Sequence, residues 1–140
     1  MPLSNAFKTR WVTFTLALVV SLLVASCVFP EEGFDGTLEG TYFLNGIDRD
    51  ETEYSGTLVL TSTEDPNVYE MQWIITGSIQ TGTGTVTGSD LLIEWAAVEG
   101  FDTASRGSGV YLISDNGDMS GERTVEGQPG VATEEAFAIK

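Results

Sequence analysis

The chain has 140 residues, a formal net charge of −15 and no histidine. A chain this acidic lacks the Lys and Arg surface that displaces counterions from nucleic acid, so the composition excludes nucleic acid as a partner. Without histidine, general acid–base catalysis near neutral pH and Ser-His-Asp hydrolysis lose their usual participant. We therefore predict a protein that is not an enzyme and that carries no metal site and no cofactor.

Residues 1–26 have the layout of a secretory signal peptide, with Lys8 and Arg10 ahead of a long apolar run. The run ends in the stretch VASC at residues 24–27, which supplies an aliphatic residue, two small residues and the only cysteine of the chain. This stretch resembles the lipobox of bacterial lipoproteins, in which the cysteine receives a diacylglyceryl group. The resemblance implies lipid attachment at Cys27 and a membrane anchor, because two or more acyl chains hold a protein durably at a bilayer.

The same resemblance gives a localisation. Val28, rather than aspartate, follows the cysteine, which favours the outer membrane if the cell has one. We predict a lipid-anchored protein of the cell envelope, at the outer membrane or the cell surface. Two alternatives stay open. The first is an uncleaved membrane helix, because residues 11–29 are nearly apolar and, at 19 residues, long enough to span a bilayer. The second is an ordinary secreted protein, which would be released from the membrane. All three place the C-terminal part outside the cytoplasm.

After the signal peptide, residues 27–39 predict a flexible tether and residues 40–140 a single domain. Proline, acidic residues and glycine dominate the tether, with little apolar periodicity. All 21 acidic residues of the chain lie after Cys27. Glycine and apolar residues are both frequent there, which favours a turn-rich folded domain over disorder.

From residue 40 onward, short alternating segments are separated by turn residues, the pattern of an all-β domain. The clearest segment is 68–75, where Tyr69, Met71 and Trp73 share one face because side chains alternate with period two along a strand. Alternating segments of this kind predict the following strands: residues 41–44, 54–61, 68–75, 78–86, 91–95, 110–113, 119–125 and 133–139.

Two segments between these strands need an interpretation. The pair Asn45-Gly46 predicts a tight turn directly after the first strand. Residues 96–107 match no regular element, so we interpret them as a loop.

About eight strands joined by short connections predict antiparallel neighbours, since parallel pairs would need long crossovers. Closing such a sheet removes its exposed edges. The predicted fold is therefore a single antiparallel up-and-down β-barrel, with a β-sandwich as second choice. Its predicted interior consists of Leu58, Leu60, Met71, Trp73, Ile75, Leu91, Ile93 and Trp95.

The residues also resemble a known superfamily. Gly40-Thr41-Tyr42 at the first strand, and Arg123 on a late strand, are similar to the lipocalin and avidin barrels, whose members commonly begin with Gly-x-Trp and pack an arginine near that ring. Here a tyrosine replaces the tryptophan. The glycine-rich run over residues 82–95 is also similar to small bacterial surface or secreted β-domains, some labelled fibronectin-binding. Both resemblances imply a barrel and name no ligand.

The candidate ligand cavity consists of Tyr69, Met71, Trp73, Trp95 and Arg123, because aromatic-rich concave pockets hold apolar ligands. The alternative is that these side chains simply fill a small barrel. Arg123 has the strand parity of inward-facing residues, and a buried charge requires a partner or an aromatic face. We expect a structural contact between Arg123 and an aromatic ring in preference to an anchor for a ligand carboxylate.

We predict a non-catalytic binding role, with a small apolar ligand inside the barrel. The alternative is a surface interaction protein or adhesin-like module with a filled barrel, whose acidic loops over residues 48–53 or 96–107 attract a basic protein partner. The carboxylates of residues 48–53 invite a calcium site, but the intervening Arg49 and the missing ligand spacing favour a solvated hairpin tip.

Overall fold

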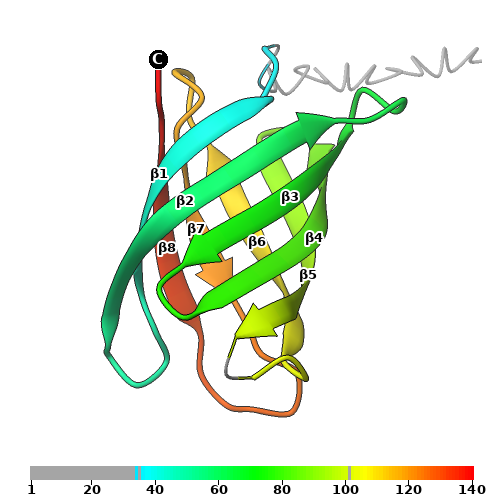
Figure 1. Cartoon of the computed structure of the whole chain (residues 1–140). Helices are drawn as coiled ribbons and strands as arrows, with labels where there is room; N and C mark the ends of the chain where they lie inside the picture. The colour runs from blue at the N-terminus through cyan, green and yellow to red at the C-terminus, as the bar shows by residue number, and fades with distance from the viewer. Residues whose placement is uncertain (1–33, 35, 101) are drawn as a thin grey trace, which may run out of the picture.

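The computed structural model describes residue 34, residues 36–100 and residues 102–140, which are coloured in Figure 1. The predicted signal peptide, the lipid site at Cys27 and most of the predicted tether lie outside the described residues. These features therefore stay predictions. Within the part that the structure describes, no helix is long and apolar enough to cross a membrane.

In the described part of the chain, eight antiparallel strands form one closed barrel. Each strand pairs with the next, and β8 returns to pair with β1, so the sheet has no free edge (Figure 1). The prediction of an all-β up-and-down barrel is confirmed, and the chain does not form the second choice, a sandwich. The strands are β1 (Gly40–Ile47), β2 (Glu53–Ser62), β3 (Val68–Ile75), β4 (Ser78–Thr87), β5 (Asp90–Gly100), β6 (Arg106–Ile113), β7 (Met119–Arg123) and β8 (Ala132–Ala138).

The interior follows the period-two alternation of the sequence. Burying such side chains on one face of each strand stabilises the barrel by about 25 cal/mol for each Å² of apolar surface removed from water. Ile75 is only half-buried, near one end of the barrel. The other predicted core residues are buried, as expected: Leu58, Leu60, Met71, Trp73, Leu91, Ile93 and Trp95.

The predicted tight turn at Asn45-Gly46 is wrong. β1 continues through both residues, and the chain turns at residues 48–52, where Glu51 has a positive φ of 67°. Gly46 faces the barrel interior, and a Cβ there would collide with the ring of Tyr54. This glycine therefore makes room for a large side chain inside the sheet instead of reversing the chain.

The interpretation of residues 96–107 as a loop is also wrong over most of that range. β5 extends to Gly100, β6 begins at Arg106, and Trp95 pairs with Gly107 across the two strands. Alanine and glycine dominate these strand ends, so their apolar alternation is weak in the sequence. Pairing with neighbouring strands supplies the stabilisation that local propensity does not provide.

The barrel has two different ends. β1 starts and β8 finishes at the end that we call the closed end, because Leu38 fills it (Figure 1). The Leu38 N–H donates to the Tyr69 hydroxyl at 3.2 Å, and its carbonyl accepts from the Tyr42 hydroxyl at 2.7 Å. Leu38 belongs to the predicted tether, so the core includes a residue of that segment. The opposite end, which we call the mouth, is formed by the β1–β2, β3–β4, β5–β6 and β7–β8 connections.

Candidate functional site

An ion pair between Arg123 and Glu134 lies inside the barrel near the mouth. The two residues come from β7 and β8, and both side chains are buried. Arg123 Nη2 donates to Glu134 Oε1 at 2.5 Å, and Arg123 Nε donates to Glu134 Oε2 at 3.0 Å. This bidentate contact fixes the plane of the guanidinium and compensates the two desolvated charges.

Uncharged side chains complete the hydrogen bonds of this pair. The Tyr54 hydroxyl donates to Glu134 Oε1 at 2.5 Å, and the Tyr111 hydroxyl donates to Glu134 Oε2. Arg123 Nη1 donates to Gln80 Oε1 at 2.6 Å. We call this set the polar layer: Tyr54, Gln80, Tyr111, Arg123 and Glu134.

Two tryptophan rings flank the guanidinium of Arg123. Its Cζ lies 4.8 Å from the ring centroid of Trp73 and 4.9 Å from that of Trp95, within the range of cation–π attraction. The rings are held by their own N–H groups: Trp73 Nε1 donates to the Tyr111 hydroxyl at 3.0 Å, and Trp95 Nε1 donates to the Thr124 carbonyl at 3.1 Å. Arg123 thus points inward and contacts aromatic rings, as its strand parity predicts.

The polar layer perturbs the pKa values of its members. Burial alone would lower the pKa of Arg123, but the carboxylate of Glu134 and the hydroxyls of Tyr111 and Tyr54 outweigh it, so this pKa is raised. Burial, followed by the negative charge of Glu134, raises the pKa of both Tyr54 and Tyr111 above the usual tyrosine value. At neutral pH the layer therefore holds a charged arginine and neutral tyrosines.

A hollow of about 360 Å³ opens at the mouth, above the polar layer. This volume is at the lower end of the range for small-molecule sites. The hollow thus combines a polar floor, a charged rim and a wall in which four apolar side chains stand among small polar ones. The floor is formed by Gln80, Trp95 and Arg123, the wall by Ile75, Ala97, Val125 and Ala132, and the rim by Asp48, Arg49 and Asp102.

The structure divides the predicted cavity residues into two groups. Trp95 and Arg123 line the hollow at the mouth, and Trp73 lies against Arg123 without lining it. Tyr69 and Met71 belong to the other part of the core, where Tyr69 contacts Leu38. Three of the five predicted residues therefore come together around one guanidinium, and two do not.

Sequence reasoning missed Glu134 and Gln80. Glu134 occupies an inward position of β8, between the buried Ala132 and Ala136, so its strand parity carried a signal. Gln80 lies directly opposite the buried Trp73 of β3, so it also has inward parity. The segment around it is rich in threonine and contains Gly82 and Gly84, so the alternation of apolar and polar residues is weak there.

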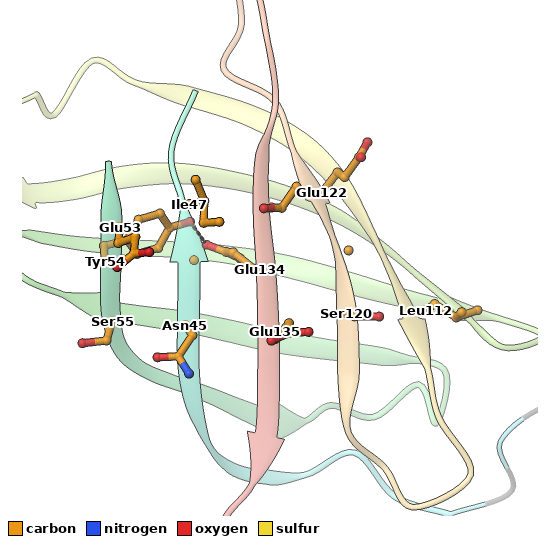
Figure 2. A pocket seen from close by; sticks show the side chains of 13 residues that line it. Asn45, Ile47, Glu53, Tyr54, Ser55, Leu112, Ser120, Glu122, Glu134 and Glu135 are labelled. Carbon is orange, nitrogen blue, oxygen red and sulfur yellow. Dashed lines mark hydrogen bonds between the residues drawn. The ribbon is translucent and has the colours of Figure 1, made fainter. Parts of the chain in front are cut away.

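A second, wider hollow of about 970 Å³ runs across the outer face of the barrel (Figure 2). It crosses β2, β1, β8 and β7 and reaches β6, and exposed carboxylates of Glu53, Glu122 and Glu135 line it. We call it the outer groove. Within residues 34, 36–100 and 102–140, no three side chains of the kinds that bind metal ions come together.

Comparisons with known proteins identify the fold and no family. The chain matches no protein-family model, and no curated protein matches it significantly. Solved structures do match: a redesigned β-barrel at a TM-score of 0.60 and 11% identity, covering 74% of this chain and 92% of the other. A de novo designed fluorescence-activating β-barrel matches at a TM-score of 0.56 and 15% sequence identity, and the match covers 72% of this chain and 93% of the designed one. The redesigned β-barrel mFAP1, bound to DFHBI, matches at a TM-score of 0.59 and 14% sequence identity, and the match covers 73% of this chain and 94% of mFAP1.

Proposed function

We propose that this protein is a lipid-anchored β-barrel of the cell envelope that binds a small, largely apolar ligand at its mouth without chemical conversion. The hollow above Arg123 and Trp95 is the observation that carries this proposal, because it joins an apolar wall to convergent polar groups. The barrel of mFAP1, which has this fold, is bound to the compound DFHBI. An eight-stranded barrel can thus hold one small molecule.

The proposed anchor fits the direction of the barrel. The described chain enters at the closed end through Leu38, opposite the mouth (Figure 1). A lipid on Cys27 would therefore tether the protein by its closed end and leave the mouth facing away from the bilayer. Mass spectrometry of the protein isolated from the envelope tests the anchor: we expect an N-terminal Cys27 carrying acyl chains, and an uncleaved chain with a free thiol would contradict it.

Tryptophan fluorescence tests the binding site. The protein is reconstituted in lipid nanodiscs and titrated with apolar and carboxylate-bearing compounds of one or two rings. We expect a saturable change in emission that persists in Trp73→Phe and is largely lost in Trp95→Phe, because Trp95 lines the hollow. Leu92→Ala on the outer face is the matched control and should bind like the unchanged protein. A response to none of the compounds would favour the alternative function, a basic protein partner bound by the acidic exterior.

A further inference from the structure

Glu134, the charged acceptor of the polar layer, has its acceptor positions filled. Each carboxylate oxygen of Glu134 accepts two hydrogen bonds, one from Arg123 and one from a tyrosine. The side-chain oxygen of Gln80 accepts from Arg123 Nη1. A ligand that offers a hydrogen-bond donor would therefore find the carboxylate of Glu134 already occupied.

The same floor also has N–H groups that are not fully used in hydrogen bonds. A guanidinium carries five N–H groups, and within the described residues Arg123 donates three hydrogen bonds, two to Glu134 and one to Gln80. The Gln80 amide nitrogen has two N–H groups and one weak contact, at 3.4 Å, with the Ser78 hydroxyl. Both Gln80 and Arg123 line the hollow. The floor therefore presents donors that a ligand oxygen can satisfy.

Charge decides which kind of oxygen fits. Glu134 already neutralises Arg123, so the guanidinium offers N–H groups with little net positive charge toward the hollow. At the rim, Asp48 and Asp102 outnumber Arg49, and the chain as a whole carries −15. A ligand carboxylate would lose its hydration and meet a rim whose net charge is negative. A neutral oxygen avoids both penalties.

Apolar side chains form part of the remaining lining, beside the hydroxyls of Thr52, Ser78 and Ser105. Ile75, Ala97, Val125 and Ala132 form its wall, and the ring of Trp95 reaches its floor. From these contacts we infer that the mouth recognises a compact, uncharged, mostly hydrocarbon ligand with a carbonyl oxygen, which accepts hydrogen bonds from Gln80 and Arg123. This inference rests on the proposed function, since it assigns a ligand class to the same site.

Three probes of similar size test the contributions of a neutral carbonyl oxygen, of apolar contact alone and of a negative charge. They are acetophenone, ethylbenzene and benzoate, respectively. The ¹⁵N-labelled protein in nanodiscs is titrated with each probe, with free concentrations set by equilibrium dialysis. The signals to follow are the side-chain amide of Gln80 and the indole N–H of Trp95. A net hydrogen bond of ordinary strength predicts acetophenone binding about threefold to tenfold tighter than ethylbenzene. Benzoate should bind more weakly than acetophenone.

A substitution at Gln80 tests the role of its amide. Gln80→Glu keeps an oxygen for Arg123 Nη1 and removes the amide donors, so the preference for acetophenone over ethylbenzene should shrink by severalfold. Gln80→Met, which removes all polar atoms, should shrink it in the same direction. Circular dichroism and thermal melting report whether each variant keeps its fold. Leu92→Ala should leave the preference unchanged.

The outcomes distinguish the two proposals. Equal binding of acetophenone and ethylbenzene, or an unchanged preference in both folded Gln80 variants, would overturn the ligand class and leave the site in place. Tighter binding of benzoate would also overturn it, because Arg123 would then act as an anchor for anions. Binding of no probe at the Trp95 and Gln80 signals would overturn the ligand class and the proposed mouth site together.

Discussion

The two ends of the barrel are filled in different ways. At the closed end, Leu38, Leu60 and Leu91 are fully buried and pack as an ordinary apolar core. Toward the mouth, the same interior holds a buried arginine and glutamate that form a bidentate ion pair. An apolar filling would have been easier to stabilise, because replacing a buried ion pair with packed hydrocarbon is often neutral or stabilising. The comparison teaches that stability alone does not explain the polar layer.

The largest expected effect on stability comes from removing a buried charge near the mouth. Glu134→Gln removes the carboxylate and leaves Arg123 desolvated without a counter-charge, so the free energy of unfolding should fall by about 3–5 kcal/mol. Urea unfolding followed by tryptophan fluorescence measures this loss. The double variant Arg123→Met with Glu134→Leu should recover most of it. A loss below about 1 kcal/mol in Glu134→Gln would show that the pair is solvated in solution.

The next effect concerns the closed end. Leu60→Ala removes a fully buried side chain and leaves a cavity, which should cost about 2–5 kcal/mol of unfolding free energy. Ligand binding at the mouth should be unchanged in the folded variant, because Leu60 does not line that hollow. Leu92→Ala, on the outer face, should stay within about 0.5 kcal/mol of the unchanged protein. A loss of ligand binding in folded Leu60→Ala would contradict the separation of the two ends.

Alkaline pH gives a smaller and more gradual effect. Burial, with Tyr69 and Asp118 nearby, raises the pKa of Tyr42 to about 12 from the usual 10.0. A raised folded-state pKa means that the unfolded chain loses its protons first as the pH rises. The contribution of such tyrosines to stability should therefore be constant below about pH 10 and then fall by about 1.4 kcal/mol per pH unit for each of them until its folded pKa is reached.

The same alkaline titration also reports on two tyrosines of the polar layer, near the mouth. The pKa values of Tyr54 and Tyr111 are also raised, by burial and by Glu134. Phenolate absorbance should therefore show most tyrosines titrating above pH 10 in the folded protein and near pH 10 after unfolding. Tyr42→Phe, at the closed end, should remove the contribution of one tyrosine to the fall of unfolding free energy with pH. Full tyrosine ionisation at pH 10 in the folded state would contradict the buried hydrogen bonds.

The fold was predictable because its signal is periodic. The alternation of Met71, Trp73 and their neighbours identifies one face of β3, and the same rule assigns the inward side of β5. Errors arose where a local signal competed with pairing between strands. Asn45-Gly46 is a favoured turn pair, yet β2 and β8 pair with it on both sides and the ring of Tyr54 needs the space.

The site was predictable only in part, for a physical reason. Strand parity shows that Arg123 faces inward, and the predicted meander makes the last two strands neighbours, but a single sequence does not fix the register between them. In the assembled sheet Glu134 lies opposite Gly121, two residues from Arg123 on the same face of β7. The register of β4 on β3, which sets Gln80 opposite Trp73 and so beside Arg123, is likewise a property of the assembled sheet.

The closed end also decides how this protein can be handled. Its C-terminal strand finishes beside the start of β1, where the Ile139 N–H donates to the Thr41 carbonyl at 2.9 Å (Figure 1). A reporter domain or an affinity handle fused after Lys140 would therefore emerge on the side opposite the mouth. The chain could be immobilised on a sensor surface through this C-terminal end while the mouth remains unobstructed.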